Sequence, residues 1–214
     1  GSQNVVDAAL KHQIKRLIYV GTANSFGYGD AKNPGKEGNP YVSGKYGLDY
    51  MDSKRKAQEL VLDAVKTKEL PALVVNPTFM IGPFDSKPSS GAMIVAVHEG
   101  KVPGYTSGGK NYVAVKDAAV AISNAVTMGR IGEAYILGNE NLTFEEAFGM
   151  IAETIGAKKI KRKLPDFIVK FYGSMSSFFA KIFKSTPAVT KELARISCDI
   201  HYYSPEKALS LIHI

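Results

Sequence analysis

Two short apolar runs separated by a long helical segment limit the fold more than any other feature of this chain. Residues 16–21 and 72–75 are rich in Leu, Ile, Val and Tyr and are short enough to be buried strands. The residues between them include a helix-length segment, 50–68, which Pro71 follows. Two parallel strands need such a crossover, and it is right-handed in nearly all proteins. This order therefore predicts an α/β fold with a parallel sheet.

Further elements are predicted on both sides of this unit. Residues 1–10 carry apolar side chains at positions 5, 6, 9 and 10, which is typical of a helix face. Thr143 and Glu146 have the spacing of a capping box that opens a helix over 144–155. Asp117 is expected to cap a helix over 118–128, in preference to acting as a catalytic carboxylate. We also expect a helix over 91–99, turns over 102–112 and a strand over 133–138.

Three side chains predict proton chemistry. Tyr50 and Lys54 are four residues apart, so on a helix they share one face. An ammonium beside a phenol favours the phenolate, which allows a tyrosine to shuttle protons near neutral pH. Thr22 follows the first apolar run and offers a hydroxyl for a substrate oxygen. A tyrosine and a lysine often have this spacing by chance, so the interpretation depends on the surrounding motifs.

Those motifs resemble one enzyme family in their order along the chain. Residues 15–27 are similar to the strand and the serine or threonine loop of the extended short-chain dehydrogenase/reductases, and Tyr50 and Lys54 match that family's active-site pair. Residues 76–83 resemble its segment that lines the nicotinamide pocket, and residues 111–117 resemble its strand leading into a helix. The branch that the chain resembles most is the dihydroflavonol reductase and 3β-hydroxysteroid dehydrogenase-like group of this epimerase/dehydratase superfamily.

The resemblance implies two domains. Residues 1–82 would form part of a dinucleotide-binding Rossmann domain, whose doubly wound parallel sheet residues 112–138, approximately, would rejoin. Residues 83–214 would otherwise form a smaller, mostly helical substrate domain. The glycine-rich turn that receives the pyrophosphate has no counterpart in the sequence. We therefore expect the chain to be a piece of a longer protein and to be inactive alone.

The last six residues give a second reason to expect a truncated gene. Residues 209–214 are also what one reading frame of a transposase mosaic-end adapter, used in sequencing libraries, encodes. We expect these residues to have no function, which the nucleotide sequence would test.

The resemblance also implies a reaction, a hydride transfer between NAD or NADP and a secondary alcohol, ketone or aldehyde. Tyr50 would exchange the proton, Lys54 would lower the pKa of the phenol and contact the cofactor ribose, and Thr22 would orient the substrate oxygen. By resemblance alone, the residues that flank the nicotinamide would be Pro77, Thr78 and Met80.

Phe79 bears on the class of substrate. Sugar-nucleotide epimerases and dehydratases commonly have an asparagine at the matching position, and an aromatic side chain cannot supply its hydrogen bonds. Phe79 therefore favours an apolar, flavonoid-like or steroid-like substrate. The other expected pocket residues are Asn24, Ser89, Ser90 and Tyr112. The rival hypotheses are a sugar-nucleotide epimerase or dehydratase, and a non-catalytic protein that senses NAD(P).

Composition narrows the class of protein. A single cysteine, Cys198, excludes an internal disulfide and is typical of a reducing compartment, so we expect a cytoplasmic protein. The net charge of +7 depends largely on a basic run over 158–163. That run lacks interleaved aromatic residues, so we expect a solvated loop or strand edge and no nucleic-acid partner. We expect no metal site.

Residues 164–184 leave three alternatives open. Apolar side chains recur there at helical spacing: Leu164, Phe167, Ile168, Phe171, Met175, Phe178, Phe179, Ile182 and Phe183. Such a face packs on its own domain or covers the substrate as a lid, lies on a membrane surface beside Lys170, Lys181 and Lys184, or forms a homodimer interface. Gly173, in the middle, is expected to divide the helix.

Overall fold

The computed structural model describes residues 1–86, 90–187 and 189–212. The chain divides into two compact units. The first consists of residues 1–82, 112–140 and 203–214, and the second of residues 83–111 and 141–202.

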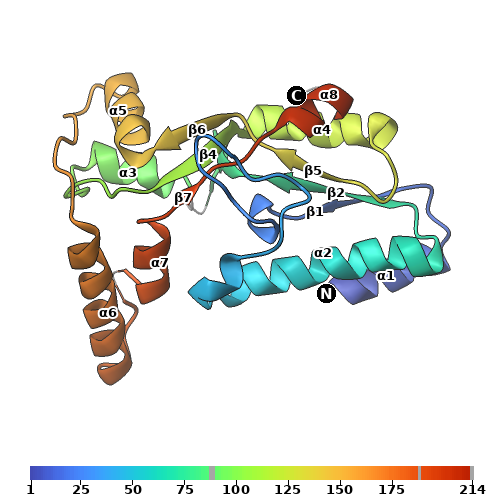
Figure 1. Ribbon diagram of the computed structural model, residues 1–214, viewed down its shortest axis with the longest axis horizontal. Helices are drawn as coiled ribbons and strands as arrows, with labels where there is room; N and C mark the ends of the chain where they lie inside the picture. The colour runs from blue at the N-terminus through green and yellow to red at the C-terminus, as the bar shows by residue number, and fades with distance from the viewer. Residues whose placement is uncertain (87–89, 188, 213–214) are drawn as a thin grey trace. The chain divides into compact units, whose positions relative to one another are not determined.

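A parallel sheet of order β1-β2-β5 forms the centre of the first unit. Strand β1 is Leu17–Val20, β2 is Ala72–Pro77 and β5 is Ala134–Leu137. Helix α2, Asp49–Lys68, connects β1 to β2 (Figure 1). The predicted parallel α/β fold is confirmed.

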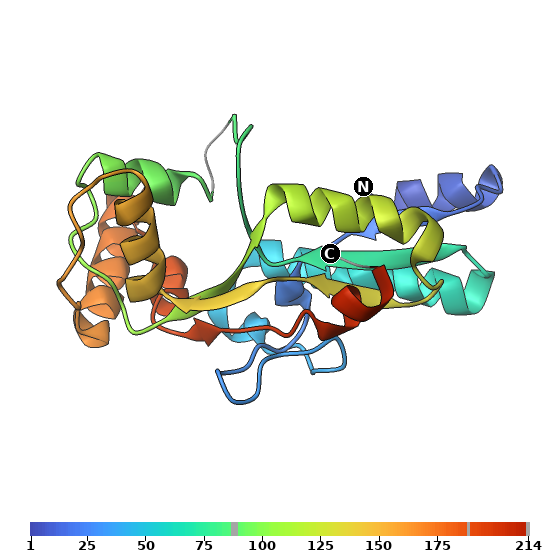
Figure 2. The same cartoon turned by 90° about the horizontal axis from the view of Figure 1, so that it is seen from above.

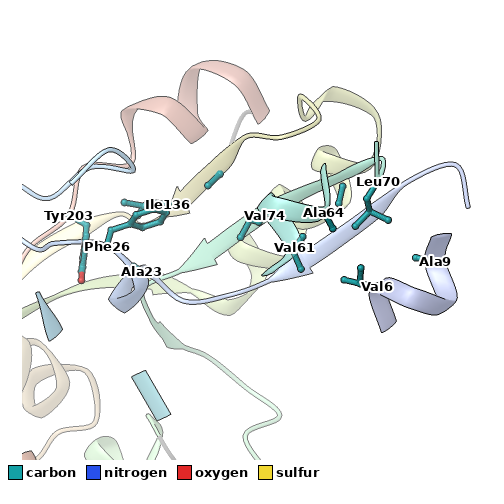
Figure 3. Close-up of a cluster of buried hydrophobic side chains, with 12 residues drawn as sticks. Val6, Ala9, Ala23, Phe26, Val61, Ala64, Leu70, Val74, Ile136 and Tyr203 are labelled. Atoms are coloured by element: carbon teal, nitrogen blue, oxygen red, sulfur yellow. The ribbon is translucent and has the colours of Figure 1, made fainter. Parts of the chain in front are cut away.

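Helices cover both faces of this sheet. Helices α1 (Ser2–Lys11) and α2 lie on one face, while α4 (Val115–Met128) and α8 (Glu206–Ile212) lie on the other (Figure 1). Strand β2 is buried along its whole length, and its alternate residues pack in opposite directions. Ala72 and Val74 join the cluster shown in Figure 3, whereas Leu73 and Val75 join the cluster under α4. Burial on both faces explains why this strand is continuously apolar.

A short strand, β3 (Phe79–Ile81), was not predicted. It pairs in parallel with the second half of β4 (Gly109–Ala114), so that Phe79 lies opposite Tyr112. Strand β4 leads directly into α4, and the N-cap is Ala114. Asp117 lies in the first helical turn, so the prediction that it caps the helix is wrong. Its carboxylate still lies where the helix dipole favours negative charge.

The second unit is mostly helical. Its helices are α3 (Ala92–His98), α5 (Phe144–Thr154), α6 (Asp166–Ile182) and α7 (Lys191–Ile196). The first half of β4 pairs with β7 (Ile200–His201) there, while β6 (Glu140–Thr143) leads into α5. The predicted capping box of Thr143 and Glu146 is confirmed.

Helix α6 packs side by side with α7 and continues through Gly173, so the expected division of the helix is wrong. Figure 2 shows the irregular segment, containing the basic run, that connects α5 to α6. No helix among the described residues is both long and apolar enough to cross a membrane. Within the described residues, no cluster of His, Cys, Asp and Glu side chains is placed to hold a metal ion.

Candidate active site

The carboxyl end of β1 fixes the position of Thr22. The Gly21 amide donates to the Val75 carbonyl at 2.8 Å, so the parallel ladder extends one residue beyond the strand. The chain then turns into a short 3-10 helix, Ala23–Ser25, for which Thr22 is the N-cap. The Thr22 Oγ1 accepts a hydrogen bond from the Asn24 amide at 3.4 Å. The Thr22 hydroxyl is buried at this strand end and still has its own proton to donate.

Helix α2 directs Lys54 to the same strand end. The Lys54 Nζ lies 3.5 Å from the Val20 carbonyl oxygen and 5.9 Å from the centroid of the Tyr19 ring. Tyr50 lies one turn earlier on α2 and is 58% exposed, so its phenol is open to a ligand. The structure therefore brings Lys54 to the end of the strand that Thr22 follows, with Tyr50 one helical turn away.

Two contacts hold the first half of α2 in place. The Arg55 guanidinium donates to the Ser25 carbonyl at 3.1 Å, which ties α2 to the 3-10 helix after Thr22. The Tyr41 hydroxyl donates to the Asp52 carboxylate at 2.5 Å. Burial and this hydrogen bond both raise the pKa of Tyr41 well above its ordinary value. Tyr41 therefore stays protonated and acts as an anchor, not as an acid.

A cluster of buried polar side chains, which no sequence pattern predicted, lies near the end of β1. Gln58, one turn after Lys54, and Asn76, on β2, are both fully buried next to Gly21. A Cβ atom at position 21 would lie 2.4 Å from Asn76 Oδ1 and 3.3 Å from Gln58 Oε1. The amide groups of Gln58 and Asn76 have no hydrogen-bond partner among the described residues. No signal in the sequence indicates that these three residues meet.

Residues at the end of β2 lie at the same edge of the sheet, because the strands are parallel. Pro77 ends β2 opposite Leu137. The Thr78 amide and hydroxyl both bond to the Leu137 carbonyl, at 2.9 and 3.2 Å, so this hydroxyl already has an acceptor. Met80 lies on β3 and is 37% exposed. These are the residues for which a place beside a nicotinamide was predicted.

The predicted substrate residues have different environments. The rings of Phe79 and Tyr112 meet edge to face, with centroids 5.5 Å apart, and Tyr112 is buried. Asn24 is half-buried in the 3-10 helix after Thr22. Ser90 belongs to the second unit, where its carbonyl accepts from the Met93 amide at 3.2 Å. Ser89 lies outside the described residues.

Comparison with protein families decides the classification. The profile of the NAD dependent epimerase/dehydratase family matches residues 1–138, which is more than half of the chain. The chain belongs to this family. The resemblance noted in the sequence is confirmed.

Two curated relatives match almost the whole chain. The putative dihydroflavonol 4-reductase of Synechocystis sp. is 26% identical over 98% of this chain and 62% of its own length. The decarboxylating sterol-4-alpha-carboxylate 3-dehydrogenase of Candida albicans is 27% identical over 99% of this chain and 64% of its own length. The crystal structure of the protein gox2253 has a TM-score of 0.82 and 32% identity, covering 99% of this chain and 64% of that one. The chain thus spans less than two thirds of the length of these relatives.

Tyr19, on β1, is another tyrosine near the candidate active site, and the chain belongs to the NAD dependent epimerase/dehydratase family. Burial raises the pKa of Tyr19, a hydrogen bond from Ser2 opposes this, and the nearby Tyr50 raises it further. Tyr19 lies within an apolar run that forms a strand, and tyrosine is a frequent residue in strands. The sequence therefore gave no reason to separate it from its neighbours.

Proposed function

We propose that the whole protein transfers hydride between NAD(P) and a secondary alcohol or its ketone, or an aldehyde, with Tyr50 as the proton shuttle. The observation that carries this proposal is the position of the Lys54 ammonium, which lies 3.5 Å from the Val20 carbonyl oxygen at the end of β1. Thr22 follows this strand end, and Tyr50 lies one helical turn before Lys54 on α2. A candidate proton donor, a cation and a second hydroxyl near the carboxyl edge of a parallel sheet support the proposal, because α/β proteins bind ligands at this edge.

Each residue has a separate role in carbonyl reduction. The Tyr50 hydroxyl would give its proton to the substrate oxygen as the carbonyl group is reduced. The Lys54 ammonium stabilises the negative charge of the phenolate that remains. Since the Thr22 oxygen accepts from the Asn24 amide, its own proton is available to hold the substrate oxygen. Bulk solvent restores the Tyr50 proton, because this side chain is exposed.

The residues at this edge fit a nicotinamide cofactor, which supplies the hydride when bound. Tyr50 and Lys54 lie beside the end of β1, and Pro77, Thr78 and Met80 follow from β2 into β3. We assign the cofactor to the first unit, which also contains the expected substrate residues Asn24, Phe79 and Tyr112. Either NAD or NADP is consistent with these residues.

The proposed substrate is apolar. The Phe79 side chain cannot form a hydrogen bond, and its ring packs against Tyr112. A sugar nucleotide would need a polar side chain at this position to hold it. The names of the two curated relatives, a dihydroflavonol reductase and a sterol dehydrogenase, support the same class. A cytoplasmic location is part of the proposal, supported by Cys198, which is buried as a free thiol.

Isotope transfer tests both the reaction and the substrate. In one reaction the whole protein is given reduced nicotinamide cofactor deuterated at C4 with a steroid or aryl ketone. In the other it is given the oxidised cofactor with a UDP-sugar. We expect net oxidation of the cofactor and deuterium on the carbinol carbon of the product from the ketone. Interconversion of the UDP-sugar without net oxidation would establish the epimerase alternative instead. Cofactor binding without turnover of either compound would support a sensor.

Phe79→Asn provides a matched variant for the substrate class. We expect it to raise the KM for the ketone by about tenfold, because a polar group replaces an apolar contact. An unchanged KM would show that Phe79 has no contact with the substrate.

A further inference from the structure

Helix α6 presents its small residues to the protein and its large residues to solvent. Gly173 and Ala180 are buried, and a Cβ atom at position 173 would lie 2.4 Å from the Cβ of Ala194 on α7. The close approach of the two helices thus uses side chains that contribute little apolar area. This is the reverse of the usual amphipathic helix in a globular domain.

The opposite face of α6 is an exposed apolar surface. Phe167 is 73% exposed, Phe171 65%, Phe178 59% and Ile182 55%, and their spacing of four, seven and four residues keeps them on one face. The same surface includes Ile168, Tyr172, Phe179 and Phe183, each at least 46% exposed. Seven of the nine apolar residues predicted to form the stripe are largely exposed, while Leu164 and Met175 are half-buried. A contiguous exposed apolar surface of this kind marks an interaction site.

The segment that contains and precedes this apolar face is strongly basic. Residues 156–184 contain eight basic residues and one acidic residue, a net +7 that equals the net charge of all 214 residues. Among the described residues of this segment, one ion pair forms, between Lys159 and Glu153 at 3.6 Å. Lys170 and Lys181 lie along one flank of the apolar face at helical spacing.

Residues preceding α6 also line a basic hollow. A cavity of about 610 Å³ lies between the end of α5 and residues 97–103. Its lining includes Lys158, Lys159, Lys161 and Arg162. The only acidic side chain in the segment, Asp166, does not contribute to this cavity. The hollow therefore offers cations to an anionic group.

We propose that the apolar face of α6, together with the basic segment before it, docks on an anionic lipid surface. Exposed aromatic side chains next to clustered lysines are the combination by which helices lie in the interface of anionic bilayers. Lysine side chains on the flank of the helix can extend their ammonium groups toward lipid phosphates while their methylenes stay near the apolar boundary. A second copy of the chain fits less well, because a two-fold interface would bring two segments of charge +7 together. This inference does not depend on the proposed reaction.

Vesicle flotation of the whole protein tests the proposal. We expect the protein to float with vesicles that contain phosphatidylserine, to bind vesicles of phosphatidylcholine alone about tenfold less, and to dissociate at high salt. The double variant Phe171→Ser, Phe178→Ser and the double variant Lys170→Glu, Lys181→Glu should each reduce binding by at least about tenfold. These side chains are exposed, so both variants should keep the melting temperature of the parent.

A matched control removes apolar side chains of similar exposure elsewhere. Val120 and Val126 on α4 are 45% and 51% exposed, and changing both to Ser should leave vesicle binding unchanged. Equal binding to neutral and anionic vesicles would overturn the proposal, as would a folded protein that binds neither. Sedimentation that shows a dimer, lost in the phenylalanine variant, would assign the surface to a second copy instead.

Discussion

Gly21 is the residue on which the geometry of the strand end depends most closely. Its backbone continues the β1 ladder, and the buried amides of Gln58 and Asn76 occupy the space where a side chain would lie. Its backbone does not have a positive φ, so space and not conformation requires glycine here. The position of Thr22, the next residue, depends on this close contact.

Gly21→Ala should therefore destabilise the protein by about 1–3 kcal/mol, since the buried amides have to move. Gly149→Ala in α5 is the matched control, because no atom lies within 4 Å of its added Cβ and a helical alanine should stabilise by about 0.5–1 kcal/mol. Urea denaturation of both variants measures the difference. Equal stability of the two variants would show that the cluster around Gly21 accommodates a methyl group.

Candidate chemical residues can be chosen from the sequence, whereas the residues that pack beneath them cannot. Tyr50, Lys54 and Thr22 could be chosen because their side chains and spacing have a meaning before folding. Gln58 and Asn76 could not be chosen, because a polar residue on a helix or at a strand end is usually exposed. Their burial depends on contacts between elements that are distant in the sequence.

Helix α5 begins with a capping box that is visible in the sequence and is formed in the structure. The Thr143 hydroxyl accepts from the Glu146 amide at 3.2 Å, and the Glu146 carboxylate accepts from the Thr143 amide at 2.8 Å. The Thr143 hydroxyl also lies 2.7 Å from the Glu146 carboxylate, to which it can donate. Donation from this hydroxyl, and then from the Thr143 amide, lowers the pKa of Glu146. The carboxylate is mostly exposed, so the effect on stability is local to the first turn.

Thr143→Ala should lower the free energy of unfolding by about 1 kcal/mol, because the helix loses its cap, whereas Thr143→Ser should lower it less. Urea denaturation of both variants measures the difference.

The charge of Glu146 contributes to stability at pH values above the ordinary glutamate pKa of about 4.3. This contribution is lost as the pH falls through the lower pKa that Glu146 has in the folded protein. Thermal unfolding as a function of pH should show this loss in the parent but not in Glu146→Gln. Identical pH profiles would contradict the role of the charge.

The sequence predicts that helix α6 forms but does not predict which of its faces is buried against α7. The apolar spacing predicted the helix, but the small residues that approach α7 gave no comparable signal, because hydropathy patterns give weight to large side chains. The vesicle experiment tests what the large, exposed side chains of α6 contact.

At the scale of the whole molecule, the order of elements along the chain was predictable and the second set of pairings was not. Strands β2 and β5 are apolar and buried along their whole length, whereas β1 is apolar but half-buried, with Val20 exposed. All three apolar runs are visible in the sequence. Strand β3 has three residues and follows β2 after a single residue, Thr78. Strand β4 begins at Gly109, within a segment for which turns were expected. Such short strands depend on partners that are distant in sequence.

The proposed function of the whole protein depends on the Tyr50 phenol as the group that exchanges the proton. The most direct test is the rate of ketone reduction by the whole protein with Tyr50→Phe, measured beside cofactor binding. We expect kcat to fall by about 10²–10⁴ while the nicotinamide cofactor still binds, because the fold and Lys54 remain. Tyr105→Phe, which removes a phenol oxygen in the second unit, should leave kcat unchanged. A Tyr50→Phe protein that reduces the ketone at the parent rate would contradict the account.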